Sequence, residues 1–200
     1  LKNIVLNDTK APKNASFKHV FVNVHDDKND ATKNVSFQLK NVKAPFGVGY
    51  LENGNDVKAT IALSLDNTQH ELLSFVKEFE TFVLDQATIK SETWFGKDLT
   101  HKQVKGMFKP SLYHKNTNYP PSLTLKVPPN CIVNDEKKNI VKLSSIQKGQ
   151  FVNAKIEIGG VWITENKFGI SWKFTQIEYS SYKPKKTQPK ANTYAFDDDE

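Results

Sequence analysis

Hydrophobic and polar residues alternate with a period of two along most of this 200-residue chain. Successive side chains of a β-strand point to opposite faces, so the alternation predicts strands with one buried face. The clearest segments are residues 35–40, 57–65, 123–127 and 152–158. Further strands are predicted at residues 3–7, 17–24, 104–115, 139–143 and 168–179. The sequence therefore predicts a mainly β protein.

One segment departs from this period and predicts a helix at about residues 68–86. The run Thr-Gln-His-Glu at residues 68–71 has the form of a capping box, and large apolar residues follow at helical spacing from Leu72 to Val83. Gly159-Gly160 interrupts a strand pattern, which predicts a bulge or a sharp bend. Many short strands with one inserted helix favour an OB-fold barrel over a sandwich.

The basic residues are of one kind: all 28 are Lys, and the sequence contains no Arg. An ammonium group contacts a phosphate as a point charge, whereas the paired hydrogen bonds that read guanine need a guanidinium group. Any nucleic-acid binding is therefore expected to depend on backbone charge and on stacking, with little base specificity.

Catalytic and metal-binding patterns find little support in the sequence. Cys131 is the single cysteine, which excludes an internal disulfide and a cysteine-based metal site. The five histidines lack metal-ligand spacing, and neither a phosphate-binding glycine loop nor a nucleophile elbow is present. We therefore expect a binding protein rather than an enzyme, without a cofactor. Since no apolar run approaches the length of a membrane span, an intracellular protein without a membrane partner is expected.

The segment from Trp94 to Lys126 combines positive charge with aromatic residues. It holds six Lys and one acid, together with five interleaved aromatic residues. Lysines can follow the phosphates of a single strand while rings stack on its bases. The lysines predicted to contact phosphates are Lys97, Lys105, Lys109, Lys115, Lys126 and Lys173. The rings predicted to stack are Trp94, Tyr113 and Tyr119, followed by Trp162. The alternative is that Trp94 and Phe95 close the core beneath a solvated lysine-rich loop.

The C-terminus divides the chain by charge. Residues 1–182 are predicted to form one domain, and residues 183–200 a basic linker with an acidic, aromatic, disordered tail. Residues 1–190 carry 28 Lys and 18 acids, whereas the last ten residues carry four acids and no Lys. Such a tail can compete with a nucleic acid or recruit partners, and it can equally be a solvated end that maintains solubility. Its candidate contact residues are Phe196, Asp197, Asp198, Asp199 and Glu200.

Several short motifs occur in an order that resembles a known family. They are Pro45-Phe46-Gly47-Val48, Ala62–Asp66, Trp94–Lys97, Pro110, Tyr119–Lys126 and Phe168–Lys173, followed by the acidic tail. Together they resemble the phage-type, acidic-tailed single-stranded DNA-binding proteins, which also occur in large nucleocytoplasmic DNA viruses. Phage members usually end in an aromatic residue, whereas here four acids follow Phe196.

The resemblance implies an OB fold and non-sequence-specific binding of single-stranded DNA in viral replication, recombination and repair. It also implies a homodimer that exchanges tails, and a tail that occupies the DNA groove and contacts replication proteins such as a polymerase or a primase-helicase. A cytoplasmic replication site in the host is expected. Two alternatives remain: a β-rich virion or scaffold protein that binds nucleic acid without strand preference, and an RNA-binding accessory factor.

Overall fold

The computed structural model describes residues 3–8, 18–26, 31–53, 56–116 and 118–180. The predicted tail, with Phe196 to Glu200, lies outside these residues. The first strands are β1 (Ile4–Asp8), β2 (Lys18–Asp26), β3 (Ala31–Asn34), β4 (Ser36–Ala44), β5 (Val48–Asn53) and β6 (Asp56–Ser64). The later strands are β7 (Phe108–Lys109), β8 (Leu112–Tyr113), β9 (Ser122–Val127), β10 (Ile132–Asn134), β11 (Gln150–Ile163) and β12 (Phe168–Ser180). The helices are α1 (His70–Ile89), α2 (Ser91–Phe95) and α3 (His101–Met107), with short 3-10 turns at Asn67–Gln69 and Leu143–Ser145.

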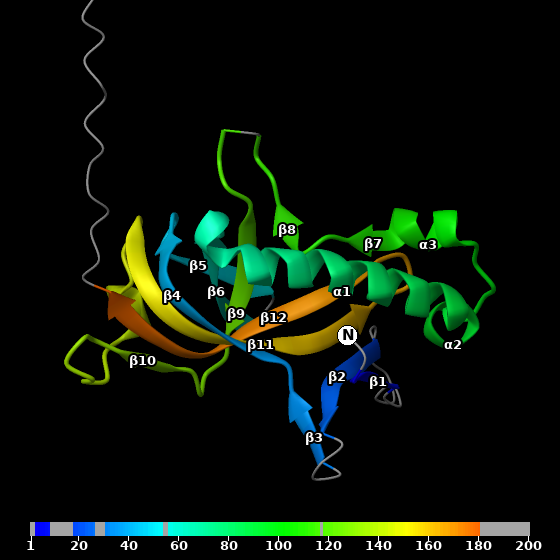
Figure 1. Cartoon of the computed structure of the whole chain (residues 1–200), viewed down its shortest axis with the longest axis horizontal. Coiled ribbons are helices and arrows are strands. Elements are labelled where there is room, and N and C mark those ends of the chain that lie inside the picture. Colours follow the sequence, from blue (N-terminus) through cyan, green and yellow to red (C-terminus); the bar gives the residue numbers. More distant parts are fainter. Residues whose placement is uncertain (1–2, 9–17, 27–30, 54–55, 117, 181–200) are drawn as a thin grey trace, which may run out of the picture.

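Five of the strands close into a barrel. β4 pairs with β6, β6 with β9, β9 with β12, β12 with β11, and β11 returns to β4. The β9–β12 pairing is parallel and the other four are antiparallel. This is a five-stranded Greek-key barrel with helices inserted between β6 and β9 (Figure 1), and the predicted mainly β, OB-type fold is confirmed.

The barrel interior holds the core. Inward residues of each barrel strand, such as Leu39, Leu63, Leu125, Ile156 and Phe174, are buried in one hydrophobic cluster. Outward residues of the same strands alternate with them and are mostly polar. The period-two pattern in the sequence therefore separates the core from an outer face that is available for binding.

Helix α1 covers part of the core with its predicted apolar stripe. Leu72, Val76, Phe79, Val83 and Ala87 are buried along it. The capping box, however, begins two residues earlier than predicted. The side chain of Asp66 accepts from the backbone of Thr68, and Gln69 bonds back to the Asp66 backbone.

The strand predicted at residues 104–115 is wrong in its first part and interrupted in its second. Thr100 and Gln103 form a capping box, which starts α3 and places Val104 in the core. Only β7 and β8 follow, separated by Pro110 and Ser111. The side chain of Ser111 accepts a hydrogen bond from the Trp172 indole, which fixes this break over the barrel.

Two other expectations need correction. The predicted strand at 139–143 is reduced to an isolated bridge between Asn134 and Ile140. The single predicted helix is accompanied by α2 and α3. By contrast, the predicted bulge at Gly159-Gly160 is confirmed, because the β11–β12 register shifts there. Beyond the barrel, β1, β2 and β3 extend as a projecting arm, attached where β2 pairs with β11 (Figure 1).

Candidate functional site

One row of residues crosses the outer face of five neighbouring strands. Phe151 on β11 pairs with Lys43 on β4, and Lys43 pairs with Ser64 on β6. Ser64 pairs with Ser122 on β9, and Ser122 with Tyr113 on β8. Partners directly opposite each other in a sheet project from the same face. The row therefore places an aromatic ring at each end of a polar floor that carries one lysine.

A tight turn adds another aromatic ring beside this floor. Phe46 lies between β4 and β5, and its side chain is 70% exposed. The next residue, Gly47, has a φ of 68°, and a Cβ there would lie 3.0 Å from the backbone nitrogen of Lys148. The backbone nitrogen of Gly149 also donates to the carbonyl of Ala44 at 2.8 Å. The turn is thus held against the segment before β11, and the Phe46 ring projects outward.

The opposite wall comes from the connection between β8 and β9, which stands above the barrel in Figure 1. Tyr113 and Tyr119 are 66% and 60% exposed. The ammonium of Lys115 lies 5.7 Å from the centre of the Tyr119 ring, within cation–π range. Rings that remain this exposed contribute little to the core and are available to stack on a ligand.

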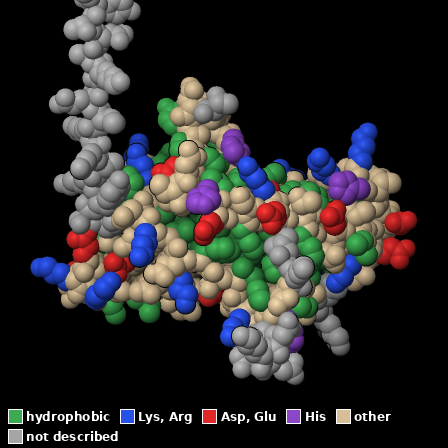
Figure 2. Space-filling view, in the orientation of Figure 1, with side chains coloured by type: hydrophobic (Ala, Val, Ile, Leu, Met, Phe, Trp, Pro, Cys, Tyr) green, Lys and Arg blue, Asp and Glu red, His purple; other side chains and the backbone are tan. Residues whose placement is uncertain are grey.

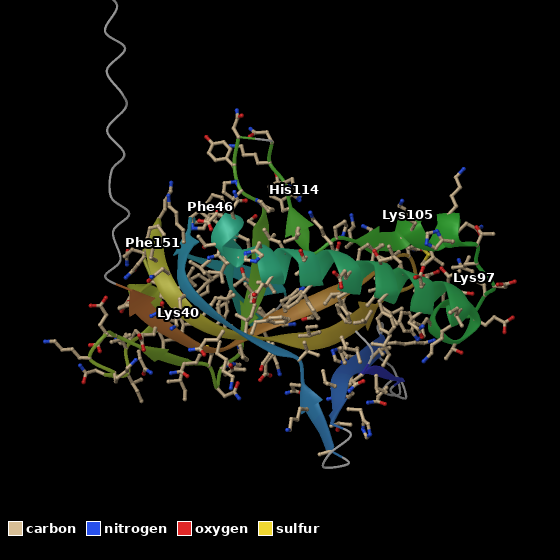
Figure 3. All side chains as sticks on the ribbon, viewed as in Figure 1. Lys40, Phe46, Lys97, Lys105, His114 and Phe151 are labelled. Atoms are coloured by element: carbon tan, nitrogen blue, oxygen red, sulfur yellow. The ribbon has the colours of Figure 1, made fainter. Side chains whose placement is uncertain are left out.

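These elements enclose a pocket of about 430 Å³, which we term the aromatic pocket. Its lining consists of Lys43, Pro45, Phe46, Ser64, Asp66, Tyr113, Lys115, Tyr119, Pro120, Ser122 and Phe151. Figure 3 shows Phe46 and Phe151 at this end of the molecule. A volume of this size accommodates small aromatic ligands, and the two lysines favour an anionic one. Asp66 is engaged at the start of the helical segment through its bonds to Thr68.

A second row of polar residues lies further along the same outer face, which we term the lysine row. Lys126 on β9 pairs with Thr60 on β6 and with Lys173 on β12. The Lys173 ammonium is 3.5 Å from the carboxylate of Glu157. Desolvation and the neighbouring Lys58 lower the pKa of Lys126. The row concentrates positive charge on a face where the fold itself does not require it.

The sequence-predicted residues fall into separate places. Tyr113, Lys115 and Tyr119 meet in the aromatic pocket, and Lys126 and Lys173 meet in the lysine row. Trp162 is half-buried against Gly169, whose partner on β7 is the exposed Lys109. Trp162 and Lys109 therefore lie together next to the start of β12.

Three predicted residues do not join these groups. Trp94 is 3% exposed and packs edge-on against Phe95 and Phe168, so its ring cannot stack on a ligand. Its position agrees with the alternative prediction that Trp94 closes the core. Lys97 and Lys105 are exposed near α2 and α3, at the end of the molecule opposite Phe46 (Figure 3).

The face covered by α1 differs in charge from the outer barrel face. The helix carries Glu71, Glu78, Glu80 and Asp85 against one lysine, Lys77. Figure 2 shows acidic, basic and histidine side chains mixed on this side. An anionic polymer would be repelled by the helix and attracted to the lysines of the barrel.

Sequence reasoning missed Lys43, Phe46 and Phe151 as site residues. Phe46 carried a signal, since a residue between proline and glycine is expected in a turn, and turns run over the protein surface. Lys43 and Phe151 belong to ordinary strand patterns, and only the barrel closure brings them into one pocket lining with Tyr113.

Among the described residues, no three of the types His, Cys, Asp and Glu are grouped so that they could hold a metal ion. Burial raises the pKa of the Cys131 thiol to about 11, so this thiol is protonated at neutral pH. None of the described helices has the length and apolar character of a membrane span.

Comparison with known proteins gives one family match and one viral relative. The model of a family described as "Family of unknown function (DUF5871)" matches residues 55–198. An uncharacterized protein of Acanthamoeba polyphaga mimivirus is 28% identical over 151 residues, which are 70% of this chain. The aligned part is 25% of that relative, so this chain spans about a quarter of its length.

Solved structures share the fold. The single-stranded DNA-binding protein gp2.5 of bacteriophage T7 has a TM-score of 0.52 at 10% identity, covering 82% of this chain and 100% of that chain. A C-terminal truncation of the single-stranded DNA-binding protein of bacteriophage Enc34 has a TM-score of 0.50 at 12% identity, covering 90% and 96% of the two chains. At these identities the likeness establishes the fold alone.

Proposed function

This chain belongs to the DUF5871 family, and we propose that it is a non-sequence-specific single-stranded DNA-binding protein. The observation that carries the proposal is the outer barrel face, on which exposed aromatic rings and lysines are contiguous. The two phage proteins with this fold are described as single-stranded DNA-binding proteins, which supports the same ligand class here. We extend the proposal to a role in viral DNA replication, recombination and repair; the mimivirus relative, itself uncharacterized, supports the viral setting.

In the proposed mechanism, bases enter the aromatic pocket and phosphates follow the lysines. Phe46, Tyr113 and Tyr119 stack on bases, and each stacked base contributes roughly 1–3 kcal/mol regardless of its identity. Lys43 and Lys115 neutralise phosphates at the pocket, and Lys126 and Lys173 do so along the lysine row. Since the chain has no arginine, the guanidinium group that reads guanine through paired hydrogen bonds is absent, and we expect little base specificity.

Strand preference follows from access to the bases. In a duplex, the base faces are covered by their neighbours in the stack and cannot reach rings in a recessed pocket. A single strand can turn its bases into the pocket while its phosphates remain on the lysines. Binding would therefore hold exposed strands open and protect them from pairing.

The acidic tail is proposed to compete for the same lysines and to recruit replication proteins. Asp197, Asp198, Asp199 and Glu200 would act as phosphate mimics, and Phe196 as a base mimic. Deletion of residues 191–200 should tighten DNA binding, because a competing anion is removed. Unchanged affinity of the truncated protein would contradict this competition. A homodimer that exchanges tails is proposed as well, and sedimentation of the full and truncated chains would test it.

The proposed function is tested by titrating the full chain with labelled oligo-dT, oligo-U and a DNA duplex of equal length, at several salt concentrations. We expect tight binding to oligo-dT and weak binding to duplex. The affinity for oligo-dT should fall with salt, but less steeply than for binding by charge alone, because stacking also contributes. Phe46→Ala should weaken binding to oligo-dT, whereas Tyr50→Ala, a comparably exposed aromatic residue on β5, should not. Equal affinity for duplex would favour the scaffold alternative, and a preference for oligo-U would favour an RNA-binding factor.

The intrinsic fluorescence gives an independent readout. Trp94 and Trp172 are buried, so quenching by an oligonucleotide would report mainly on Trp162. Quenching by oligo-dT without quenching by duplex would place bases on the side of the barrel where Trp162 lies.

A further inference from the structure

The side chain of His19 on β2 fills the space beside the glycine bulge of β11. Gly160 has a φ of 129°, and a Cβ there would lie 2.5 Å from the His19 ring and 2.6 Å from the carbonyl of Val20. The imidazole also forms a hydrogen bond with the backbone of Gly159. The backbone of Gly160 has a positive φ and leaves no room for a side chain. The His19 ring occupies the space that a side chain would take, so the bulge fixes the position of the ring.

Phe21 extends this site outward along the arm. Its ring is 4.9 Å from that of His19, at an interplanar angle of 73°. Phe21 is 52% exposed, whereas Val20 and Val22 on the opposite face of β2 are buried. Trp162 is the direct partner of His19 across β11 and β2. An exposed ring held edge-on by a fixed neighbour is a preorganised surface for stacking.

His19 lies on the same outer face as the lysine row, because its partner Trp162 pairs with Gly169, which shares a face of β12 with Lys173. Both Lys126 and Lys173 are close enough to His19 that their charges help desolvation to lower its pKa. A neutral imidazole therefore lies within electrostatic range of two ammonium groups on the outer face, and an exposed ring lies beside it. This combination of a flat apolar surface with adjacent cations matches a nucleotide, whose base and phosphate need these two environments.

We propose that His19 and Phe21 form a second stacking site for the same single strand, distinct from the aromatic pocket. The inference rests on the proposed function and extends it to the N-terminal arm. From Ser122 to Lys126 the path covers about 13 Å along β9, and from β9 through β12 and β11 to β2 it crosses about 14 Å of strand spacings. A strand must be long to fill both sites, so oligonucleotide length separates them.

The test compares Phe21→Ala with the wild-type chain on oligo-dT of about 4 and about 16 nucleotides, the range of footprints found for OB folds. We expect the long oligonucleotide to bind Phe21→Ala about five- to tenfold more weakly, and the short one to bind both proteins equally. Tyr50→Ala serves as the matched control and should leave both affinities unchanged. Unchanged long-oligonucleotide affinity in Phe21→Ala would overturn the inference, as would equal losses at both lengths.

A second variant guards against a folding defect. Phe21→Trp retains a large ring and adds a fluorophore at the proposed site. Its added fluorescence should be quenched by the long oligonucleotide and not by the short one, and absence of quenching by either would also overturn the inference. If the wild-type chain binds neither oligonucleotide, the proposed function itself fails. If it binds both while Phe21→Ala is indistinguishable from it, only the second site fails.

Discussion

Lys126 on β9 and Lys173 on β12 are direct neighbours in the parallel pairing that closes the barrel. Like charges placed opposite each other across a sheet destabilise it. Glu157 compensates Lys173, but the neighbour that acts on Lys126 is another ammonium, that of Lys58. We expect this arrangement to lower the stability of the free protein and to favour the binding of an anion.

Replacing Lys126 should therefore separate stability from binding. In Lys126→Gln we expect the free energy of unfolding to rise by about 0.2–1 kcal/mol, because a like-charge contact is removed. Binding to oligo-dT should weaken, and the slope of log K against log salt should become shallower by about 0.7, the value for one phosphate contact on a single strand. Chemical denaturation and a salt series measure the two effects.

The control for this variant is Lys142→Gln, which removes an exposed lysine from the segment before the turn at Leu143–Ser145. It should leave the salt slope and the stability close to those of the wild type. If both variants change the slope equally, the lysine row has no special role and only the overall charge matters.

Tyr119 tests whether the aromatic pocket binds by stacking. Tyr119→Ala should lose roughly 1–3 kcal/mol of binding free energy for oligo-dT. Its thermal stability should stay near that of the wild type, because the ring is 60% exposed. Tyr119→Phe retains the ring without the hydroxyl group and should bind nearly as well. A loss of equal size in both variants would instead indicate a hydrogen bond from the hydroxyl group.

The lowered pKa of His19 predicts that the stability of the protein depends on pH. Desolvation and the charges of Lys126 and Lys173 lower its pKa below 6.5, and the hydrogen bond to Gly159 opposes this shift only in part. The unfolded chain takes up a proton near pH 6.5, whereas the folded chain does so only at lower pH. The stabilising contribution of neutral His19 is therefore present above about pH 6.5 and is lost on acidification.

Denaturation at intervals between pH 7.5 and pH 5 would reveal this contribution. We expect the stability of His19→Gln to decline less on acidification than that of the wild type. His114→Gln, on the connection between β8 and β9, controls for the loss of a histidine as such. If the stability of wild type and of His19→Gln changed identically with pH, the surroundings of His19 would not disfavour its protonation.

Two glycines distinguish a required backbone from a permissive one. Gly160→Ala places a Cβ against the His19 ring at a φ of 129°, and it should destabilise the fold by roughly 1–3 kcal/mol. Gly106→Ala meets nothing within 4 Å inside α3, and it should stabilise by up to about 1 kcal/mol. Thermal denaturation of both variants checks the contrast, and equal effects would contradict the role given to the bulge.

The sequence patterns predicted the strands best where one face is buried throughout. The alternating segments 57–64 and 152–158 lie in β6 and β11. The pattern was misleading at residues 104–115, where a local capping box and Pro110 outweighed the alternation of apolar residues. The hydrogen bonds of this capping box at Thr100 fix the start of α3.

The site divides in the same way. Tyr113, Lys115 and Tyr119 lie close together in the sequence, which predicted that they form one group, and all three line the aromatic pocket. Trp94 was misassigned as a stacking residue, because its place under Phe168 depends on a contact across 74 residues. An exposed and a buried tryptophan look alike in a sequence.

The amino-acid sequence by itself determined a mainly β chain whose basic residues are all lysines. It also determined one long amphipathic helix and a cluster of aromatic residues beside lysines. These properties depend on neighbours within a few residues, whose spacing fixes the local structure. Only the tertiary structure decided which outward residues meet. Phe151, Lys43 and Tyr113 come from distant segments, and the position of the His19 ring depends on Gly160 of β11. Barrel closure joins strands in an order that differs from the chain order, so the binding face is a property of strand register and not of local sequence.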